Sequence, residues 1–350
     1  MTSKERVLTT FNHQEPDRVP MWCGASDEFW LKAKNQLNLD DQSLRVRFHD
    51  DFRRVSAVYK GPSELTRQDA TYITPFGVER HGLGYGQPYS HPLATASLDE
   101  IHSYPWPIAE WNDVSGIRPE AEKYYHEYAI LGGDWSPFWH DAIDLLGMEI
   151  FFIKMYTEPE IVDALLRHIM DYYIESSNKI FSAAADKIDI FFFGNDFGSQ
   201  TGPLMDDTLF RRFIVPHIKN LVNLGHDFNL KVMMHCCGGI RQLIPAMIET
   251  GLDALHAVQP SCYGMELAVL KKEFGNRMVF NGCIDSHHVL IDGDPAAVKK
   301  QTKAVLDIMM PGGGFIAGAS HDTILEETPL ENVLAMFDTI LEHGIYQGWS

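Results

Sequence analysis

The chain has 350 residues, 45% of them hydrophobic, and carries a formal net charge of −19 at pH 7. A chain of this length can bury roughly 75% of the surface that its unfolded form exposes, so it can build a large core. A surface this acidic repels phosphate backbones and anionic lipid headgroups, which makes nucleic acids and membrane surfaces poor partners.

We expect neither membrane insertion nor export from this sequence, and its cysteines indicate metal or thiol chemistry. It has no run of about 18 apolar residues, and its opening, MTSKERVLTTFNH, is too polar for a signal peptide. We therefore expect a cytoplasmic protein. In that setting an odd number of cysteines predicts metal or thiol chemistry rather than a disulfide framework. The five are Cys23, Cys236, Cys237, Cys262 and Cys283.

The first 125 residues are irregular. Residues 2–12 fit a short helix with Ser3 as its cap, and residues 18–23 follow a proline and fit a first strand. Residues 60–125 are rich in glycine, proline and aromatic side chains. We expect them to form hairpins and loops over one mouth of the fold.

From about residue 125, short apolar runs alternate with helical segments. Strands are expected at residues 129–133, 189–194, 231–234, 254–258, 278–281 and 314–318. Helices are expected at residues 138–152, 157–184, 206–223, 239–250 and 265–274, and from 294 and 328 onward. Such alternation indicates βα units and a parallel sheet. About eight strands without a nucleotide-type glycine fingerprint favour one α/β domain over residues 1–350, a TIM (β/α)8 barrel with an N-terminal extension.

Some helix starts carry explicit signals. Thr157 and Glu160 have capping-box spacing. Asp206 and Asp207 fit a cap, and Asp294 fits one before Pro295, which suits the first position of a helix.

Chemistry in such a barrel sits where strands end and loops begin. His235-x-Cys237 directly follows one strand, and alternate residues leaving a strand point the same way. An imidazole and a thiolate are zinc ligands, and a catalytic zinc takes three protein ligands. We expect the third to be Cys283 or His321, each after a later strand. The alternative is a buried structural histidine beside inert cysteines.

Two carboxylates follow strands as well. Asp196 is a candidate general acid or base, or a group that binds a cationic substrate, and its alternative is a loop aspartate bonded to its own backbone. Asp285 precedes two histidines and is a second catalytic candidate, with a helix cap as the alternative. Three further strand-end or aromatic candidates, Gln259, Gln200 and His140, are expected to contact substrate. Trp22 is a fourth, with core packing as its alternative. For Gln259 the alternatives are support of the metal ligands and a cap on the loop.

These residues resemble the uroporphyrinogen decarboxylase superfamily over nearly the whole chain. The similar segments are SKERVLTTFNHQEPDRVPMW, LGMEIFFIKMYTEPEIVDALL, GNDFGSQTGPLMDDTLFRRFIVPHIKNLV, VMMHCCGGIRQLIPAMIETGLDALHAVQP, FGNRMVFNGCID and GGGFIAGASHDTILEETPLENV. The superfamily contains tetrapyrrole decarboxylases and corrinoid-linked methyltransferases, including coenzyme M methyltransferases and O-demethylase components.

The chain differs from the decarboxylase pattern in one segment and from the methyltransferase pattern in another. True decarboxylases carry an arginine-rich MRQAGR-type segment near the N-terminus, whereas this chain reads MWCGASDEFW and has no arginine between Arg18 and Arg45. Methyltransferase members carry His-x-Cys, as at His235, and a later cysteine ligand. Here Ser320-His321 stands in place of that cysteine.

The resemblance therefore implies a zinc-dependent methyltransferase that pairs with a corrinoid (cobalamin) protein and often forms a homodimer. We expect it to demethylate a small methylated substrate, such as an O-methyl compound. Methylation of a thiol by methylcobalamin is an alternative. Two rivals are a metal-free tetrapyrrole decarboxylase, anchored by Arg53, Arg54 and Arg80, and a barrel that binds without turnover.

Overall fold

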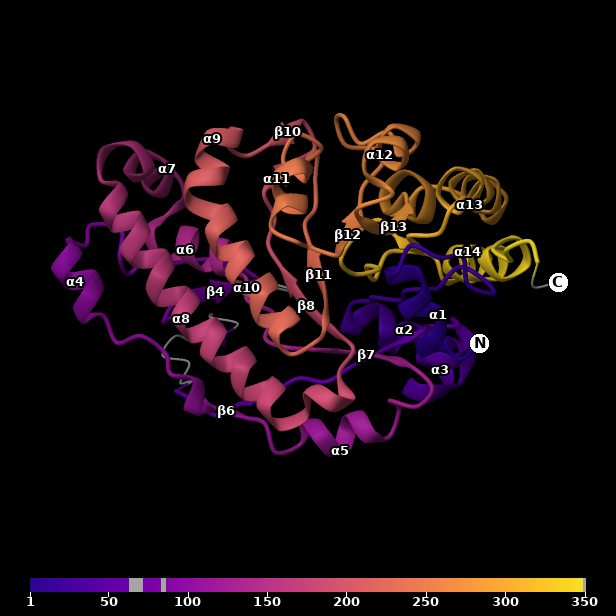
Figure 1. Cartoon of the computed structure of the whole chain (residues 1–350), viewed down its shortest axis with the longest axis horizontal. Coiled ribbons are helices and arrows are strands. Elements are labelled where there is room, and N and C mark those ends of the chain that lie inside the picture. The colour runs from indigo at the N-terminus through magenta and orange to yellow at the C-terminus, as the bar shows by residue number, and fades with distance from the viewer. Residues whose placement is uncertain (63–71, 83–85, 349–350) are drawn as a thin grey trace.

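The computed structural model describes residues 1–62, 72–82 and 86–348, and its centre is a parallel sheet curled on itself (Figure 1). Seven strands run in the order β1-β7-β8-β11-β12-β13-β14, and every pairing among them is parallel. Their bounds are β1 Phe52–Arg54, β7 Ala129–Gly132, β8 Ile190–Gly194, β11 Lys231–His235, β12 Ala254–Val258, β13 Val279–Ile284 and β14 Phe315–Ala319. The expected strands after residue 125 are thus confirmed.

Residues 20–22 close the barrel between its two edge strands. The backbone N–H of Trp22 donates to Ala317 of β14 at 2.9 Å, and Met21 is a parallel bridge partner of the same residue. On the other side the N–H of Asp51, just before β1, donates to the carbonyl of Met21 at 3.0 Å. This segment takes the place of the expected first strand and gives the sheet eight positions, which confirms the TIM barrel.

Helices cover the outside of the sheet (Figure 1). Those that follow the barrel strands are α6 Phe138–Leu146, α7 Met148–Thr157, α8 Pro159–Ala184, α9 Asp207–Leu209, α10 Val215–Asp227, α11 Ile244–Glu249, α12 Leu267–Phe274, α13 Pro295–Met309 and α14 Leu330–His343. Two π-helical turns precede α10 and α13, at η3 Phe210–Ile214 and η4 Ser286–Ile291. The N-terminal part adds α1 Ser3–Phe11, α2 Asp27–Leu37, α3 Asp41–Arg47, α4 Leu98–Ser103 and α5 Ile117–Glu122.

Two apolar cores follow from this arrangement. A small cluster fills the barrel interior, with Trp22, Phe192 and Met233 among its members. Val7 and Phe11 of α1 belong to the same cluster and close the amino-terminal end of the barrel. A much larger cluster packs between the strands and the surrounding helices. Alternate residues of one strand serve the two cores, because successive strand side chains point to opposite faces.

The segment between β1 and β7 forms short antiparallel pairs, as expected for residues 60–125. Strands β3 Tyr72–Ile73, β4 Glu79–His81 and β5 Gln87–Pro88 make a small sheet, and β2 Val58–Tyr59 pairs with β6 Asn112–Asp113. An ion pair from Arg80 to Asp144 joins the small sheet to α6. Residues 63–71 and 83–85 of the expected hairpin region lie outside the described residues.

Helix starts differ from two of the predictions. Thr2, not Ser3, caps α1, and it forms a reciprocal box with Glu5. Thr157 does not cap α8, because its hydroxyl donates to the carbonyl of Ile153 one turn earlier. The predicted caps Asp206 and Asp294 are confirmed.

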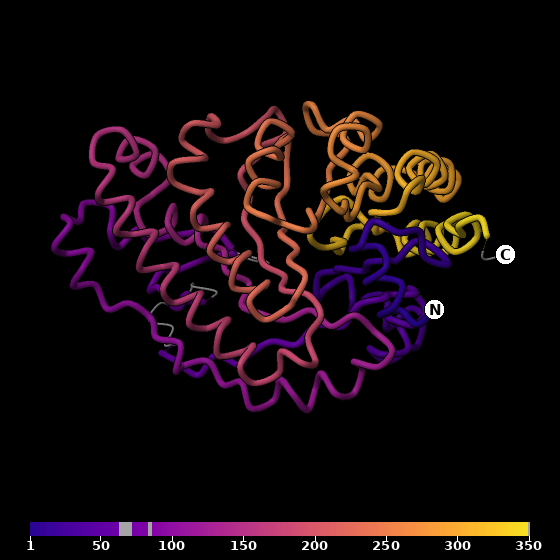
Figure 2. The backbone as a smooth tube through the Cα atoms, viewed as in Figure 1, coloured from indigo at the N-terminus to yellow at the C-terminus, as the bar shows by residue number. Residues whose placement is uncertain are grey.

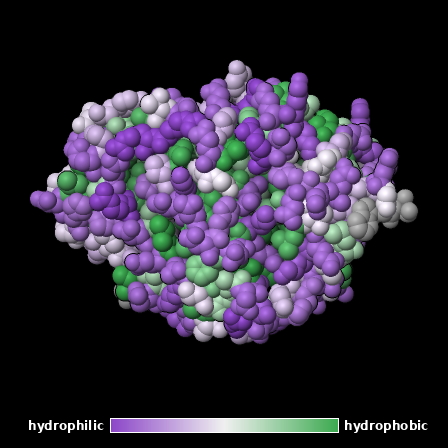
Figure 3. Space-filling model, in the orientation of Figure 1, coloured by the Kyte–Doolittle hydropathy of each residue, from purple (hydrophilic) through white to green (hydrophobic). Residues whose placement is uncertain are grey.

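The face shown in Figure 3 is largely hydrophilic, with apolar residues in small separate groups. The two termini lie on the same side of the molecule (Figure 2), where the N–H of Val19 donates to Gly344 at 2.8 Å. Among the described residues no helix has the length and apolar character needed to cross a membrane.

Candidate active site

Side chains from four strands of the barrel, β8, β11, β12 and β14, or from the loops that follow them, meet toward its carboxyl-terminal mouth. His235 is the last residue of β11, and Cys237 follows it in the loop. Asp196 follows β8, and Asp322 follows β14. His256, within β12, lies directly opposite His235 in the strand register.

Asp196, His235 and Cys237, here called the donor cluster, present one nitrogen, one sulfur and one oxygen to a common point. Cys237 Sγ lies 3.2 Å from His235 Nε2, and Asp196 Oδ1 lies 3.2 Å from the same nitrogen. All three donor atoms lie within 4.8 Å of one another. Asp196 is fixed because its Oδ1 also accepts the backbone N–H of Cys237 at 2.7 Å. This mixed set suits zinc, which accepts histidine, cysteine and carboxylate ligands.

The opposite edge of the His235 ring faces a second pair of groups. Its Nδ1 lies 3.0 Å from Nδ1 of His256 and 3.9 Å from Oδ1 of Asp322. Both imidazoles are buried, and Trp135 lies beside the His235 ring at a centroid distance of 5.8 Å.

The charges in this region stabilise one another. Burial alone would lower the pKa of His235, but Cys237, Asp322 and Asp196 together raise it well above its ordinary value. Burial would raise the pKa of Asp196, but its hydrogen bond to His235 and the nearby histidines lower it. The cluster therefore favours a positive charge beside a carboxylate, which is also what a bound cation requires.

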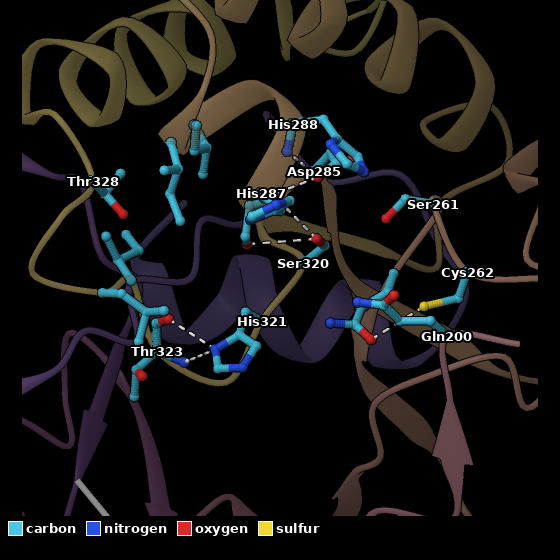
Figure 4. A pocket seen from close by; sticks show the side chains of 16 residues that line it. Gln200, Ser261, Cys262, Asp285, His287, His288, Ser320, His321, Thr323 and Thr328 are labelled. Carbon is cyan, nitrogen blue, oxygen red and sulfur yellow. Dashed lines mark hydrogen bonds between the residues drawn. The ribbon is translucent and has the colours of Figure 1, made fainter. Parts of the chain in front are cut away.

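Neither of the two expected third ligands joins the donor cluster. Cys283 is fully buried in the apolar layer between sheet and helices, where burial raises the pKa of its thiol. His321 turns toward Thr323, with its Nδ1 3.0 Å from the carbonyl and 3.3 Å from the N–H of that residue (Figure 4). Asp196, expected as a catalytic group, is instead the third member of the donor cluster.

A cavity of about 330 Å³ with a mixed polar and apolar lining opens near the donor cluster, whose own residues do not line it. Figure 4 shows side chains from several strand-end loops facing it. Among those that line it are Gln200, Gln259, Asp285, Ser320 and His321. Its size suits a small molecule or part of a larger one.

Gln259 lines the cavity and hydrogen-bonds to the loop that carries Cys237, which matches the loop-capping alternative for this residue. Its Oε1 accepts the N–H of Gly238 at 2.8 Å and a longer contact from the thiol of Cys262. Gly238 directly follows Cys237, so Gln259 orders the loop that carries the cluster sulfur.

Asp285 caps a helix, which is the alternative given for it from the sequence. Its Oδ1 accepts the backbone N–H groups of His287 and His288 at 2.9 and 3.0 Å, which caps η4. The carboxylate still lies on the cavity wall.

The two aromatic candidates lie in different surroundings. His140, at the start of α6, is partly exposed, and its Nε2 lies 3.6 Å from Oδ2 of Asp196. Trp22 belongs to the interior core and packs against His256 at a centroid distance of 4.8 Å. Core packing, the alternative given for Trp22, therefore describes its position.

The arginines that a decarboxylase would need have other partners. Arg53 is buried beside Asp50 and lies over the ring of Tyr128, and Arg80 pairs with Asp144. Arg54 lies over the rings of Trp135 and Phe192. Among the described residues that line the cavity, none is lysine or arginine.

His256 and Asp322 were not among the expected site residues. A signal for His256 was present, since residues 254 and 256 face the same side of a strand and Ala254 is an interior residue. A polar residue at such a position, opposite His235, indicates a function beyond packing.

Comparisons with known proteins extend over most of the chain. A family model described as uroporphyrinogen decarboxylase (URO-D) matches residues 115–343. Two proteins named methylcobamide:CoM methyltransferase MtbA are similar to the chain. That of Methanosarcina mazei is 22% identical over 346 residues, or 90% of this chain and 93% of the relative. That of Methanosarcina acetivorans is 23% identical with the same coverage.

Decarboxylases and a solved structure match as well. A uroporphyrinogen decarboxylase of Acinetobacter baumannii is 27% identical over 242 residues, 67% of this chain and 64% of the relative. The solved structure of a methyltransferase from Methanosarcina mazei matches with a TM-score of 0.67 at 18% identity, covering 98% of this chain and 99% of that one. At this identity the structural match establishes a shared fold.

Proposed function

The chain belongs to the uroporphyrinogen decarboxylase family, and from this membership we propose that it is a methyltransferase acting between a corrinoid and a small molecule. In this proposal a partner protein carries the corrinoid, and zinc binds to Asp196, His235 and Cys237. The observation that supports it best is the donor cluster, whose three ligand atoms lie within 4.8 Å of one another at the barrel mouth. The similarity to two methylcobamide:CoM methyltransferases over 90% of the chain supports the same reaction class.

The protein's own groups have distinct tasks in this reaction. Asp196 and His235 hold the cluster geometry through their direct contact, and Gln259 orders the adjoining loop. His140, close to the other oxygen of Asp196, is placed to hold or pass a proton at Nε2. Zinc, when bound, supplies Lewis acidity, which lowers the pKa of a thiol or makes a methylated oxygen or nitrogen a better leaving group.

Two directions of transfer fit this site. Demethylation of a small methylated compound passes the methyl group to the corrinoid, whereas methylation of a thiol takes it from methylcobalamin. The names of the similar proteins favour the thiol as methyl acceptor. The cavity has both polar and apolar lining residues and accommodates either kind of molecule.

A methyl-transfer assay tests the proposal and its direction. Purified protein is mixed with methylcobalamin and a series of thiols, or with cob(I)alamin and methylated ethers and amines, and the corrinoid absorbance is followed. We expect turnover with one series, abolished in Cys237→Ser. The matched control is Cys236→Ser, since Cys236 is buried in the outer core beside Phe197. Equal activity of the two variants, or turnover with neither series, would contradict the proposal.

The tetrapyrrole decarboxylase is less well supported. Its substrates are polycarboxylates, and Arg53 and Arg80 are already paired with acidic groups. Incubation with uroporphyrinogen should release no carbon dioxide above background.

A further inference from the structure

Two histidines on adjacent strands form a buried pair beneath the donor cluster. His235 and His256 lie opposite each other in the parallel register of β11 and β12. Their Nδ1 atoms are 3.0 Å apart, a hydrogen-bond distance, and His256 has no exposed surface. A hydrogen bond between two such nitrogens needs one proton, so one ring donates and the other accepts.

The donor cluster determines which ring must donate when a cation is bound. Cys237 and Asp196 both approach Nε2 of His235, so a shared cation would bind that nitrogen. A neutral imidazole that binds metal through Nε2 carries its proton on Nδ1. The only direction left for the buried hydrogen bond is then from His235 to His256.

We propose that His256 is a positioning residue, which accepts the Nδ1 proton of His235 and so fixes both the tautomer and the ring orientation needed for metal binding. This inference rests on the proposed metal site. Groups that orient a ligand histidine in this way contribute substantially to metal affinity in other proteins. Asp322, with Oδ1 3.9 Å from the same Nδ1, adds negative charge that favours the donating form of His235.

The surroundings of His256 argue against a packing role alone. Its ring lies against Trp22 and Phe192, at centroid distances of 4.8 and 5.3 Å, where an apolar side chain would pack well. Its Nε2 is buried and has no hydrogen-bond partner among the described residues. A buried polar atom without a partner is unfavourable, because it has lost its hydrogen bonds to water. The contact to His235 gives a reason for retaining a histidine despite this cost.

Metal affinity tests the inference independently of turnover. Zn(II) and Co(II) binding to the full chain is measured by competition with a chromogenic chelator, and the Co(II) absorption spectrum reports sulfur ligation. His256→Leu and His256→Phe remove the acceptor, whereas His256→Asn keeps an oxygen near the position of Nδ1. Phe192→Leu is the matched control, because it disturbs the packing of the same ring and leaves the hydrogen bond in place.

We expect the Leu and Phe variants to bind both metals roughly 10- to 100-fold more weakly than the wild type. His256→Asn should recover most of the affinity, and Phe192→Leu should stay close to wild type. Thermal unfolding identifies any variant that fails to fold, and either acceptor-free variant suffices if the other is unfolded.

Three results would overturn the inference. Wild-type affinity in a folded Leu or Phe variant would remove the role of His256 and leave the metal site intact. An equal loss in Phe192→Leu would assign the effect to packing. A wild-type protein that binds neither metal would overturn this inference together with the proposed metal site.

Discussion

At the scale of single residues, His235 connects two environments of different chemistry. One edge of its ring faces the sulfur and carboxylate of the donor cluster, and the other faces the barrel interior. With almost no exposed surface, the ring has little freedom to turn. Substitutions of the groups around His235 should therefore lower metal affinity more than they lower the free energy of unfolding.

Gln259 provides a test at this scale, because it acts on the donor cluster through one backbone bond. Gln259→Leu removes the acceptor for the N–H of Gly238 and should loosen the loop after Cys237. We expect a loss of methyl transfer of about tenfold or more, comparable to that from other groups that support metal ligands. Gln259→Glu keeps an oxygen in place and should retain more activity. Steady-state rates of methyl transfer are measured for both variants. Equal rates in Gln259→Leu and wild type would show that Gln259 does not support the donor cluster.

The sequence was sufficient to locate part of the site. The spacing of His235 and Cys237 indicated side chains on the same side of the chain, and they do meet. The contribution of Asp196 as a third donor was not predictable, because it depends on how the loop after β8 bends to the backbone of Cys237. Cys283 was a plausible ligand by type, but its place in the strand directs it to the outer core.

At the scale of secondary structure, helices α6 and α8 share a buried acidic contact. The hydroxyl of Tyr173 donates to Oδ2 of Asp141, and Asp144 lies nearby. Burial, assisted by the charge of Asp144, raises the pKa of Asp141 to about 7 even though the bond from Tyr173 opposes this. The folded protein therefore keeps this carboxyl protonated at pH values where an unfolded chain would ionise it.

This raised pKa predicts a pH dependence of stability. Between about pH 4 and pH 7 the unfolded state binds fewer protons than the folded state, so the free energy of unfolding should fall as pH rises. The contribution is on the order of 1.4 kcal/mol for each unit of pKa difference. Asp141→Asn cannot ionise and should flatten this part of the profile. Urea unfolding of both proteins at several pH values measures it, and parallel profiles would show that Asp141 does not titrate in this range.

Helix capping offers a second test, and it separates a confirmed prediction from a wrong one. Asp294 accepts the N–H of Ala297 at 2.8 Å, so Asp294→Ala should destabilise the protein by about 1 kcal/mol. Thr157 was predicted to cap α8 from its capping-box spacing to Glu160, but it makes no cap bond to that helix. Thr157→Ala should therefore change the midpoint of denaturant unfolding very little. A larger effect from Thr157→Ala than from Asp294→Ala would contradict these assignments.

Most helices and strands were predictable because alternating apolar runs are a local signal. The capping pattern at Thr157 was misleading because Pro159 opens α8 without any side-chain cap. The expected strand over residues 18–23 is reduced to bridges around Met21, since its pairing depends on distant residues. Tertiary contacts of that kind leave no mark in a local sequence pattern.

At the scale of the whole molecule, a buried ionic network holds the closing segment of the barrel. Asp51 has no exposed side-chain surface, and it accepts hydrogen bonds from Arg6, from Arg18 and from the backbone N–H of Met21. Residues of α1 and of the segment at residues 20–22 are thereby joined to the start of β1. Breaking one member of such a network leaves buried charges without compensation.

Asp51→Ala should therefore cost roughly 3–5 kcal/mol in the free energy of unfolding. Asp17→Ala is the control, because Asp17 contacts the same Arg6 but is partly exposed and should cost less. Calorimetry or denaturant titration measures both. Similar small losses in the two variants would show that the barrel closes without help from this network.

Two predictions at this scale concern the protein's surroundings. The cytoplasmic location and the homodimer stay predictions.

Zinc-edge X-ray absorption on the purified protein tests the central claim most directly. The account predicts about one sulfur ligand at 2.3 Å with nitrogen and oxygen ligands near 2.0–2.2 Å, and loss of the sulfur contribution in Cys237→Ser. A wild-type spectrum with no sulfur in the zinc shell, or a sulfur signal that survives in Cys237→Ser, would contradict it.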